Sequence, residues 1–138
     1  MLCLKRVATL FVLLMTTLLF SKSMWHYDFE KACVKAKQEH KNIMLLVVGK
    51  HCRWCKKMKY HTLKKREVKE KLGSYVRVSL PYEAYKNFTY LPQIHTVPQL
   101  FFMTPNQKIL ASVRGYCSAD ALITFIEGME ENLSMKKH

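Results

Sequence analysis

Hydrophobic and polar residues recur along the chain with two different periods, which predict an alternation of helices and strands. A helix is expected to begin after Asp28, whose carboxylate can cap it, and to end at 40–42. Four apolar residues follow the helical spacing i, i+3, i+4 and i+7: Phe29, Ala32, Cys33 and Ala36. The continuous apolar run 43–48, which stops at Gly49, predicts a strand buried on both faces, as in a parallel or mixed sheet.

The remaining pattern continues this alternation. A basic helical stretch is expected from 53 towards 72, 75–80 alternates as a second strand, and 81–96 has only a weak pattern. Three further elements are expected: a strand over 99–103, a partner strand over 108–114 after a turn at 105–107, and a helix capped by Ser118 with Leu122, Phe125, Ile126 and Met129 on one face. The order of elements predicts an α/β fold.

The composition narrows the classes of function. The chain has 138 residues, of which 49% are hydrophobic, so it suits a single domain with a buried core. Lys and Arg outnumber Asp and Glu by 23 to 10, but the lysines are spread along the chain. No RNA-binding motif with interleaved aromatic residues occurs. We therefore expect a solvated basic surface and no nucleic-acid partner.

The first 23 residues have the pattern of a secretory signal peptide. A positive start, Lys5-Arg6, precedes the uncharged run 7–20, and 21–23 has small residues at its first and third positions. Cleavage after this segment leaves 24–138 as the mature domain, exported to the periplasm or another extracytoplasmic space. An uncleaved anchor is the alternative, although a membrane span needs about 20 apolar residues.

Four cysteines remain after cleavage, and an even number in an exported chain permits disulfides. Cys52 and Cys55 are separated by only two residues, which indicates a reactive dithiol rather than a structural bridge. Cys33 and Cys117 either stay independent thiols or pair with each other. Both interpretations stay open, because the connectivity of cysteines cannot be deduced from sequence.

Two separate motifs resemble the thioredoxin superfamily. They are Cys52-Arg53-Trp54-Cys55 at a helix start after a buried strand, and Thr96-Val97-Pro98 at the entry to the next strand. The pattern of Lys56, Met58, Val68 and Leu72 after the cysteines resembles that of the small exported thioredoxin-like subgroup. Gly115, near the end of the last strand, also fits the superfamily pattern. The resemblance implies a three-layer sandwich, with a central mixed sheet and helices on both faces, and a protein disulfide oxidoreductase.

Three positions depart from the classical thioredoxin pattern. His51 stands where classical thioredoxins have Trp, Arg53-Trp54 stands where they have Gly-Pro, and Leu46 stands where they bury an aspartate. The resemblance therefore implies the fold and the chemistry, but not the strongly reducing role of thioredoxin itself.

Thiol–disulfide exchange needs an attacking thiolate and a second thiol within reach. Cys52 is expected at a helix N-terminus, where free N–H groups and the helix dipole lower the pKa of its thiol below the ~8.5 of free cysteine. The positive charges of His51, Arg53 and Lys56 lower that pKa further. Since a stable thiolate favours the reduced protein, we expect a reduction potential less negative than thioredoxin's. Cys55, one turn on, is expected to be more buried and to resolve the mixed disulfide.

Further residues are expected at the substrate site. Pro98 should be cis, which places it beside the dithiol and leaves the Val97 backbone available to pair with an extended client segment. Trp54 is expected on the surface as a hydrophobic client contact, the alternative being a core position. His51 either accepts the proton of the resolving thiol or is an exposed loop residue.

Two other classes of function stay open. Cys52 and Cys55 can hold a metal together with His51 or His61, although tetrahedral zinc takes four ligands and no second pair of this kind follows. The fold can also serve as an interaction module whose dithiol is incidental. The expected enzyme is a monomer without a cofactor or metal. Its partners are protein thiol or disulfide clients and a membrane redox partner, and the direction of electron flow stays open.

Overall fold

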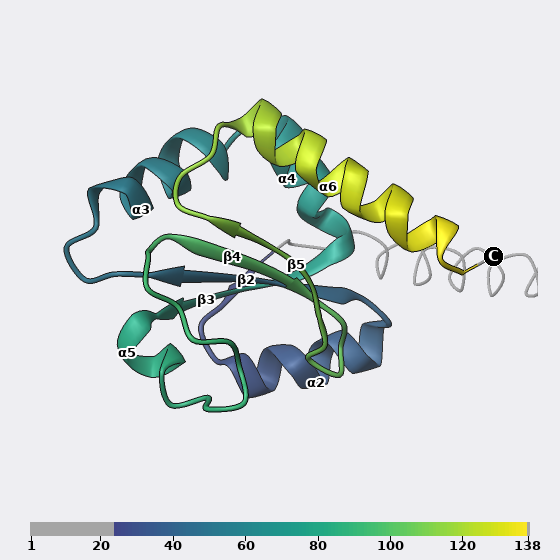
Figure 1. The fold of residues 1–138 in the computed structure, drawn as a ribbon, viewed down its shortest axis with the longest axis horizontal. Helices are drawn as coiled ribbons and strands as arrows, with labels where there is room; N and C mark the ends of the chain where they lie inside the picture. The colour runs from purple at the N-terminus through teal and green to yellow at the C-terminus, as the bar shows by residue number, and fades with distance from the viewer. Residues whose placement is uncertain (1–23, 138) are drawn as a thin grey trace, which may run out of the picture.

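Five strands form one mixed sheet between two layers of helices (Figure 1). The computed structural model describes residues 24–137, so the expected signal peptide, residues 1–23, lies outside the described residues. In chain order the elements are β1 (Trp25–His26), α2 (Phe29–Glu39), β2 (Asn42–Val48), α3 (Arg53–Lys57), a π-helix (Met58–Thr62), α4 (Arg66–Lys71), a 3-10 turn (Leu72–Ser74), β3 (Tyr75–Pro81), α5 (Tyr82–Tyr85), β4 (Gln99–Met103), β5 (Ile109–Arg114) and α6 (Ala119–Met135). The predicted three-layer α/β fold is confirmed.

The register of the sheet brings three chain segments to one edge. The strands lie in the order β1-β3-β2-β4-β5, with β1, β3 and β2 parallel and with β4 and β5 antiparallel to their neighbours. Val47 pairs with Leu80 on one side and with Gln99 on the other. The carboxyl ends of β2 and β3 therefore meet the start of β4, and the loops that continue from them lie together.

β2 is the central strand and is buried on both faces, as its apolar run predicted. Ile43, Leu45 and Val47 belong to the core under α2, whereas Met44 and Leu46 belong to the core under α4 and α6. Figure 1 shows α2 on one side of the sheet and α4 and α6 on the other. Because burial of a large aliphatic side chain contributes roughly 1.5–3 kcal/mol, this run holds the strand in the middle of the sheet.

Both predicted helix caps are confirmed. The backbone N–H of Lys31 donates to the Asp28 carboxylate at 3.1 Å, and that of Ala121 donates to the Ser118 hydroxyl at 3.3 Å. His40, with φ of 52°, closes α2 in the left-handed conformation. The hairpin of β4 and β5 is also present.

The apolar pattern did not predict β1 or α5. β1 pairs with β3, and the ring of Trp25 lies 5.6 Å from the guanidinium carbon of Arg77. Arg77 and Ser79, the polar positions of β3, are each only 4% exposed. A two-residue strand is too short for periodicity to reveal, yet it changes β3 from an edge strand to an interior one.

No helix of residues 24–137 has the length and apolar character needed to cross a membrane.

The single helix expected over 53–72 is divided into shorter segments. α3 passes into a π-helix that ends at Thr62, and α4 begins only at Arg66. The Thr62 side chain is fully buried, and its hydroxyl donates a 2.6 Å hydrogen bond to the carbonyl of Cys117, in the loop before α6. Apolar spacing cannot distinguish this wider turn from a regular helix.

Candidate active site

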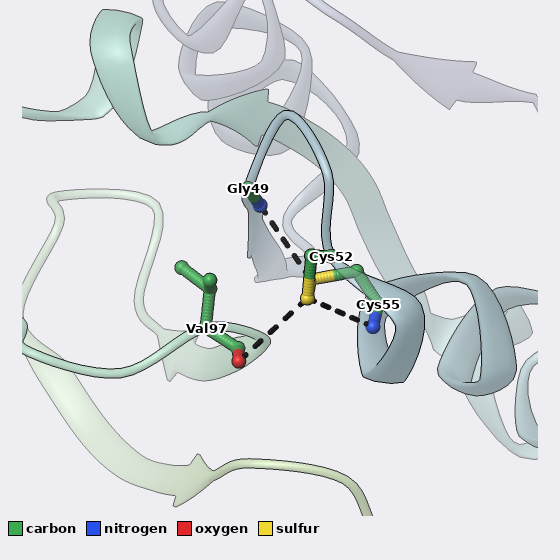
Figure 2. The surroundings of a disulfide bond; sticks show 4 residues. All are labelled: Gly49, Cys52, Cys55 and Val97. Carbon is green, nitrogen blue, oxygen red and sulfur yellow. Dashed lines mark hydrogen bonds between the residues drawn. A yellow bond between two sulfur atoms is a disulfide. The ribbon is translucent and has the colours of Figure 1, made fainter.

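The two motif cysteines lie at the start of α3 and are joined in a disulfide with sulfurs 2.20 Å apart. Cys52 is the residue before the helix, and its Sγ accepts a 3.0 Å hydrogen bond from the Cys55 backbone N–H (Figure 2). Cys52 is half-buried, whereas Cys55 is only 3% exposed. The expected difference in burial between the two cysteines is confirmed.

Gly49 occupies a position beside the dithiol that has no room for a side chain. Its N–H donates to Cys55 Sγ at 3.5 Å (Figure 2). A Cβ at this position would lie 2.9 Å from Cγ2 of Val97 and 3.3 Å from Cβ of Cys52, closer than the ordinary contact of about 3.5–4.0 Å. The lack of a side chain therefore allows Val97 to approach Cys52. The sequence pattern predicts only the end of a strand at Gly49.

The Val97–Pro98 peptide bond is cis, as predicted. The Pro98 carbonyl accepts a 2.8 Å hydrogen bond from the N–H of Gly115, whose φ of 75° suits a glycine. The Val97 carbonyl oxygen lies 3.8 Å from Cys52 Sγ, and Figure 2 shows it pointing towards the sulfur. The two motifs, 45 residues apart in sequence, thus face each other.

A cleft of about 600 Å³ lies beside Val97. Its walls come from Gly49 and Lys50, from the segment 81–83 and from the segment 94–97. No backbone–backbone hydrogen bond of the described residues involves Val97. Its backbone N–H is therefore available to an extended peptide, its C=O faces the Cys52 sulfur, and the cleft offers space for a neighbouring side chain of that peptide.

Trp54 lies on the surface, 46% exposed, rather than in the core. Its ring centre is 5.6 Å from that of Tyr116, a contact that the sequence did not predict. The Lys57 ammonium lies 5.0 Å from the Trp54 ring and 4.7 Å from the Tyr116 ring, and the Arg53 guanidinium is 5.3 Å from the indole. Cation–π contacts of this kind hold the indole in place beside the dithiol.

The remaining predicted site residues, His51, Arg53 and Lys56, are all exposed. No side-chain hydrogen bond within residues 24–137 connects His51 to Cys55; the donor that contacts the Cys55 sulfur is the N–H of Gly49. The position at which classical thioredoxins bury an aspartate is occupied by the fully buried Leu46, which has no carboxylate to accept a proton.

Cys33 and Cys117 are not paired with each other. Cys33 belongs to the core under α2, and Cys117 packs against the core on the opposite face of the sheet. Since the sheet lies between them, they cannot form a bridge without rearranging the fold. Burial raises the pKa of both thiols. Of the two interpretations, the independent thiols are confirmed.

No three His, Cys, Asp or Glu side chains within residues 24–137 are grouped so that they could hold a metal ion. The two motif sulfurs are bonded to each other, and His51 and His61 are exposed. Nothing in this part of the chain favours the metal-binding alternative.

Comparisons with known proteins agree with the fold. The family model described as Thioredoxin-like domain matches residues 29–130. Similar solved structures include the DsbH oxidoreductase, with 22% identity, a TM-score of 0.65 and coverage of 77% of this chain and 83% of that one. The C-terminal domain of Neisseria meningitidis DsbD in its oxidised form has 19% identity, a TM-score of 0.61 and coverage of 79% and 99%. A thioredoxin from Thermus thermophilus has 17% identity, a TM-score of 0.62 and coverage of 75% and 84%. None of the curated protein sequences matches the chain.

Proposed function

Since this chain belongs to the thioredoxin-like domain family, we propose that it exchanges thiols and disulfides with client proteins outside the cytoplasm. Cys52 is the attacking cysteine and Cys55 the resolving one. The observation that carries the proposal is the approach of the two motifs, with Cys52 Sγ 3.8 Å from the Val97 carbonyl oxygen and with no backbone–backbone hydrogen bond to Val97 among residues 24–137.

In the reductive direction, the Cys52 thiolate attacks one sulfur of a client disulfide, a mixed disulfide forms and one client thiolate leaves. The Cys55 thiolate then attacks Cys52 Sγ, which breaks the mixed disulfide and releases the second client thiolate. Two electrons have passed to the client, and the Cys52–Cys55 disulfide remains. Oxidation of a client dithiol follows the same steps in reverse. Because the electrons move only between sulfurs, the reaction needs no cofactor.

Backbone N–H groups support both sulfurs in these steps. The Cys55 N–H, 3.0 Å from Cys52 Sγ, is placed to stabilise the attacking thiolate, and the positive charges of Arg53 and Lys56 act in the same direction. The Gly49 N–H, 3.5 Å from Cys55 Sγ, is placed to stabilise the resolving thiolate. Equilibration with glutathione should give a reduction potential less negative than the approximately −270 mV of thioredoxin, and a value at or below that level would contradict this account.

The client binds across the cis-proline loop. An extended client segment pairs with the Val97 backbone, Pro98 shapes the loop that presents it, and the exposed indole of Trp54 contacts the client on the other side of the disulfide.

The N-terminal pattern of the sequence supports export of the mature domain, 24–138. A membrane redox partner then supplies or removes the electrons, and the protein acts as a monomer. This part of the proposal rests on residues 1–23, which lie outside the described residues. Mass spectrometry of the protein recovered from the extracytoplasmic fraction gives the position of cleavage.

Two matched substitutions test the redox proposal. Cys55→Ser should trap the client on Cys52 as a mixed disulfide, because no second thiol resolves it, whereas Cys52→Ser should trap none and should not reduce insulin. Cys33→Ala, which removes a buried thiol of α2, is the control and should keep the wild-type rate. Insulin reduction that persists in Cys52→Ser would contradict the proposal.

A further inference from the structure

The chain segment that contains the dithiol carries an unusual concentration of positive charge. Residues 50–65 include seven Lys and Arg residues and no Asp or Glu. Arg53, Lys56 and Lys57 line a shallow hollow of about 350 Å³ together with Trp54, Tyr60 and His61. Lys64 extends this surface, since its ammonium lies 4.5 Å from the ring of Tyr60. We call the six residues that line the hollow, together with Lys64, the cationic face.

Six Lys and Arg residues elsewhere in the described part of the chain are paired with carboxylates, but those of the cationic face are not. Lys35, Lys71 and Lys86 each form an ion pair with a glutamate. Within residues 24–137, no carboxylate lies within ion-pair distance of a Lys or Arg residue of the cationic face. Unpaired like charges repel one another. A negatively charged ligand bound to this face would therefore reduce the electrostatic repulsion.

Aromatic side chains hold part of this charge in a defined place. The Lys57 ammonium lies over the rings of both Trp54 and Tyr116, and the Lys64 ammonium lies over Tyr60. Tyr60 is 60% exposed and Trp54 46% exposed. A pre-positioned cation loses less side-chain entropy when it binds a carboxylate, and the exposed rings offer apolar contact area at the same time.

From these contacts we infer that the cationic face docks an acidic segment of the client protein, beside the cysteines that react with Cys52. The inference rests on the proposed redox function. Arg53 and Trp54 lie between the two motif cysteines, so whatever covers the hollow also lies next to Cys52. A client protein brings its own sulfur to that place, whereas a lipid surface docked there would cover Cys52 and exclude the client.

The test compares two peptides that contain the same disulfide, one flanked by Asp and Glu and the other by Asn and Gln. The wild-type protein should show a kcat/KM about tenfold higher for the acidic peptide at 10 mM salt, mainly through a lower KM. This preference should shrink towards equality at 200 mM salt, because the Debye length falls from about 30 Å to below 10 Å.

Two double variants with the same loss of charge separate the cationic face from the net charge. Lys57→Gln/Lys64→Gln should reduce the acidic-to-neutral ratio of kcat/KM at least about threefold. Lys37→Gln/Lys108→Gln removes two exposed lysines that have no ion pair among residues 24–137 and should keep the ratio. Because each ratio is measured on one protein, a change at the dithiol itself cancels.

Two results would overturn the inference. One is equal kcat/KM for the two peptides in the wild-type protein, and the other is an equal loss of preference in both double variants. If equal kcat/KM is accompanied by binding of the wild type, but not of Lys57→Gln/Lys64→Gln, to phosphatidylcholine vesicles containing one quarter phosphatidylglycerol, the cationic face binds a lipid surface instead. Turnover without a charge preference refutes only the docking, whereas no turnover of either peptide refutes the redox function as well.

Discussion

Gly49→Ala adds one methyl group between the end of β2 and the cis-proline loop, next to the dithiol. The new carbon would lie 2.9 Å from Cγ2 of Val97 and 3.3 Å from Cβ of Cys52. Ordinary carbon contacts are about 3.5–4.0 Å, so Val97 has to retreat by roughly 0.6–1.1 Å or the loop has to move with it. Either movement separates Val97 from Cys52.

The expected effect on activity is larger than the effect on stability. Overpacking costs typically 1–3 kcal/mol, and the low end of that range applies because Val97 is half-exposed and can shift. A displacement of about 1 Å at a reacting centre can cost up to about 100-fold in rate. We therefore expect a loss of about 1 kcal/mol in the free energy of unfolding and a fall of about 10- to 100-fold in the rate of mixed-disulfide formation.

Urea unfolding and stopped-flow exchange with a model disulfide peptide measure the two quantities. Val97→Ala in the same chain removes the 2.9 Å contact and leaves the Val97 Cβ at 4.0 Å, so the double variant should recover stability relative to the sum of the single changes. Gly73→Ala is the control, because nothing lies within 4 Å of a Cβ at that position. Wild-type rate and stability in Gly49→Ala would refute the steric argument.

Three other predictions concern the rest of the molecule. Gly128→Ala should raise the free energy of unfolding by up to about 1 kcal/mol, because it removes a helix-interior glycine of α6 where a Cβ meets nothing; an unchanged urea midpoint would contradict this. Burial, and then the hydrogen bond to Glu130, raises the pKa of Tyr75, so stability should fall as pH rises above about 10, where unfolded tyrosine ionises. Tyr75→Phe should make that fall smaller in urea titrations between pH 8 and 11. In the reduced protein, iodoacetamide should label Cys52 well before Cys33, whose pKa is raised by burial, and mass spectrometry of short reactions reads the order.

Local patterns in the chain were sufficient for several parts of the structure. The apolar run of β2 identified a strand buried on both faces, and Asp28 and Ser118 marked the starts of α2 and α6. The dithiol and the cis-proline motif were likewise visible as short motifs. Each of these features depends on residues that are neighbours in sequence, where side-chain chemistry and backbone geometry act directly.

Contacts between distant segments could not be predicted from local sequence patterns. The parallel pairing of β1 with β3 buries Arg77, and the separation of Cys33 from Cys117 follows from the faces of the sheet on which they lie. The position of Gly49 against Val97 depends on the register of β2 with β4. A one-residue change of register would turn every side chain of a strand to its other face without altering any local pattern.

The amino-acid order alone thus indicated thiol–disulfide chemistry, because two cysteines one helical turn apart and a proline before a strand can be recognised directly in the sequence. Whether those groups lie close together depended on the folded sheet. The sheet places the Val97 carbonyl oxygen 3.8 Å from Cys52 Sγ, with Gly49, which has no side chain, packed against both residues. The reason is that distances across a sheet arise from strand pairing and close packing, which the whole chain determines together.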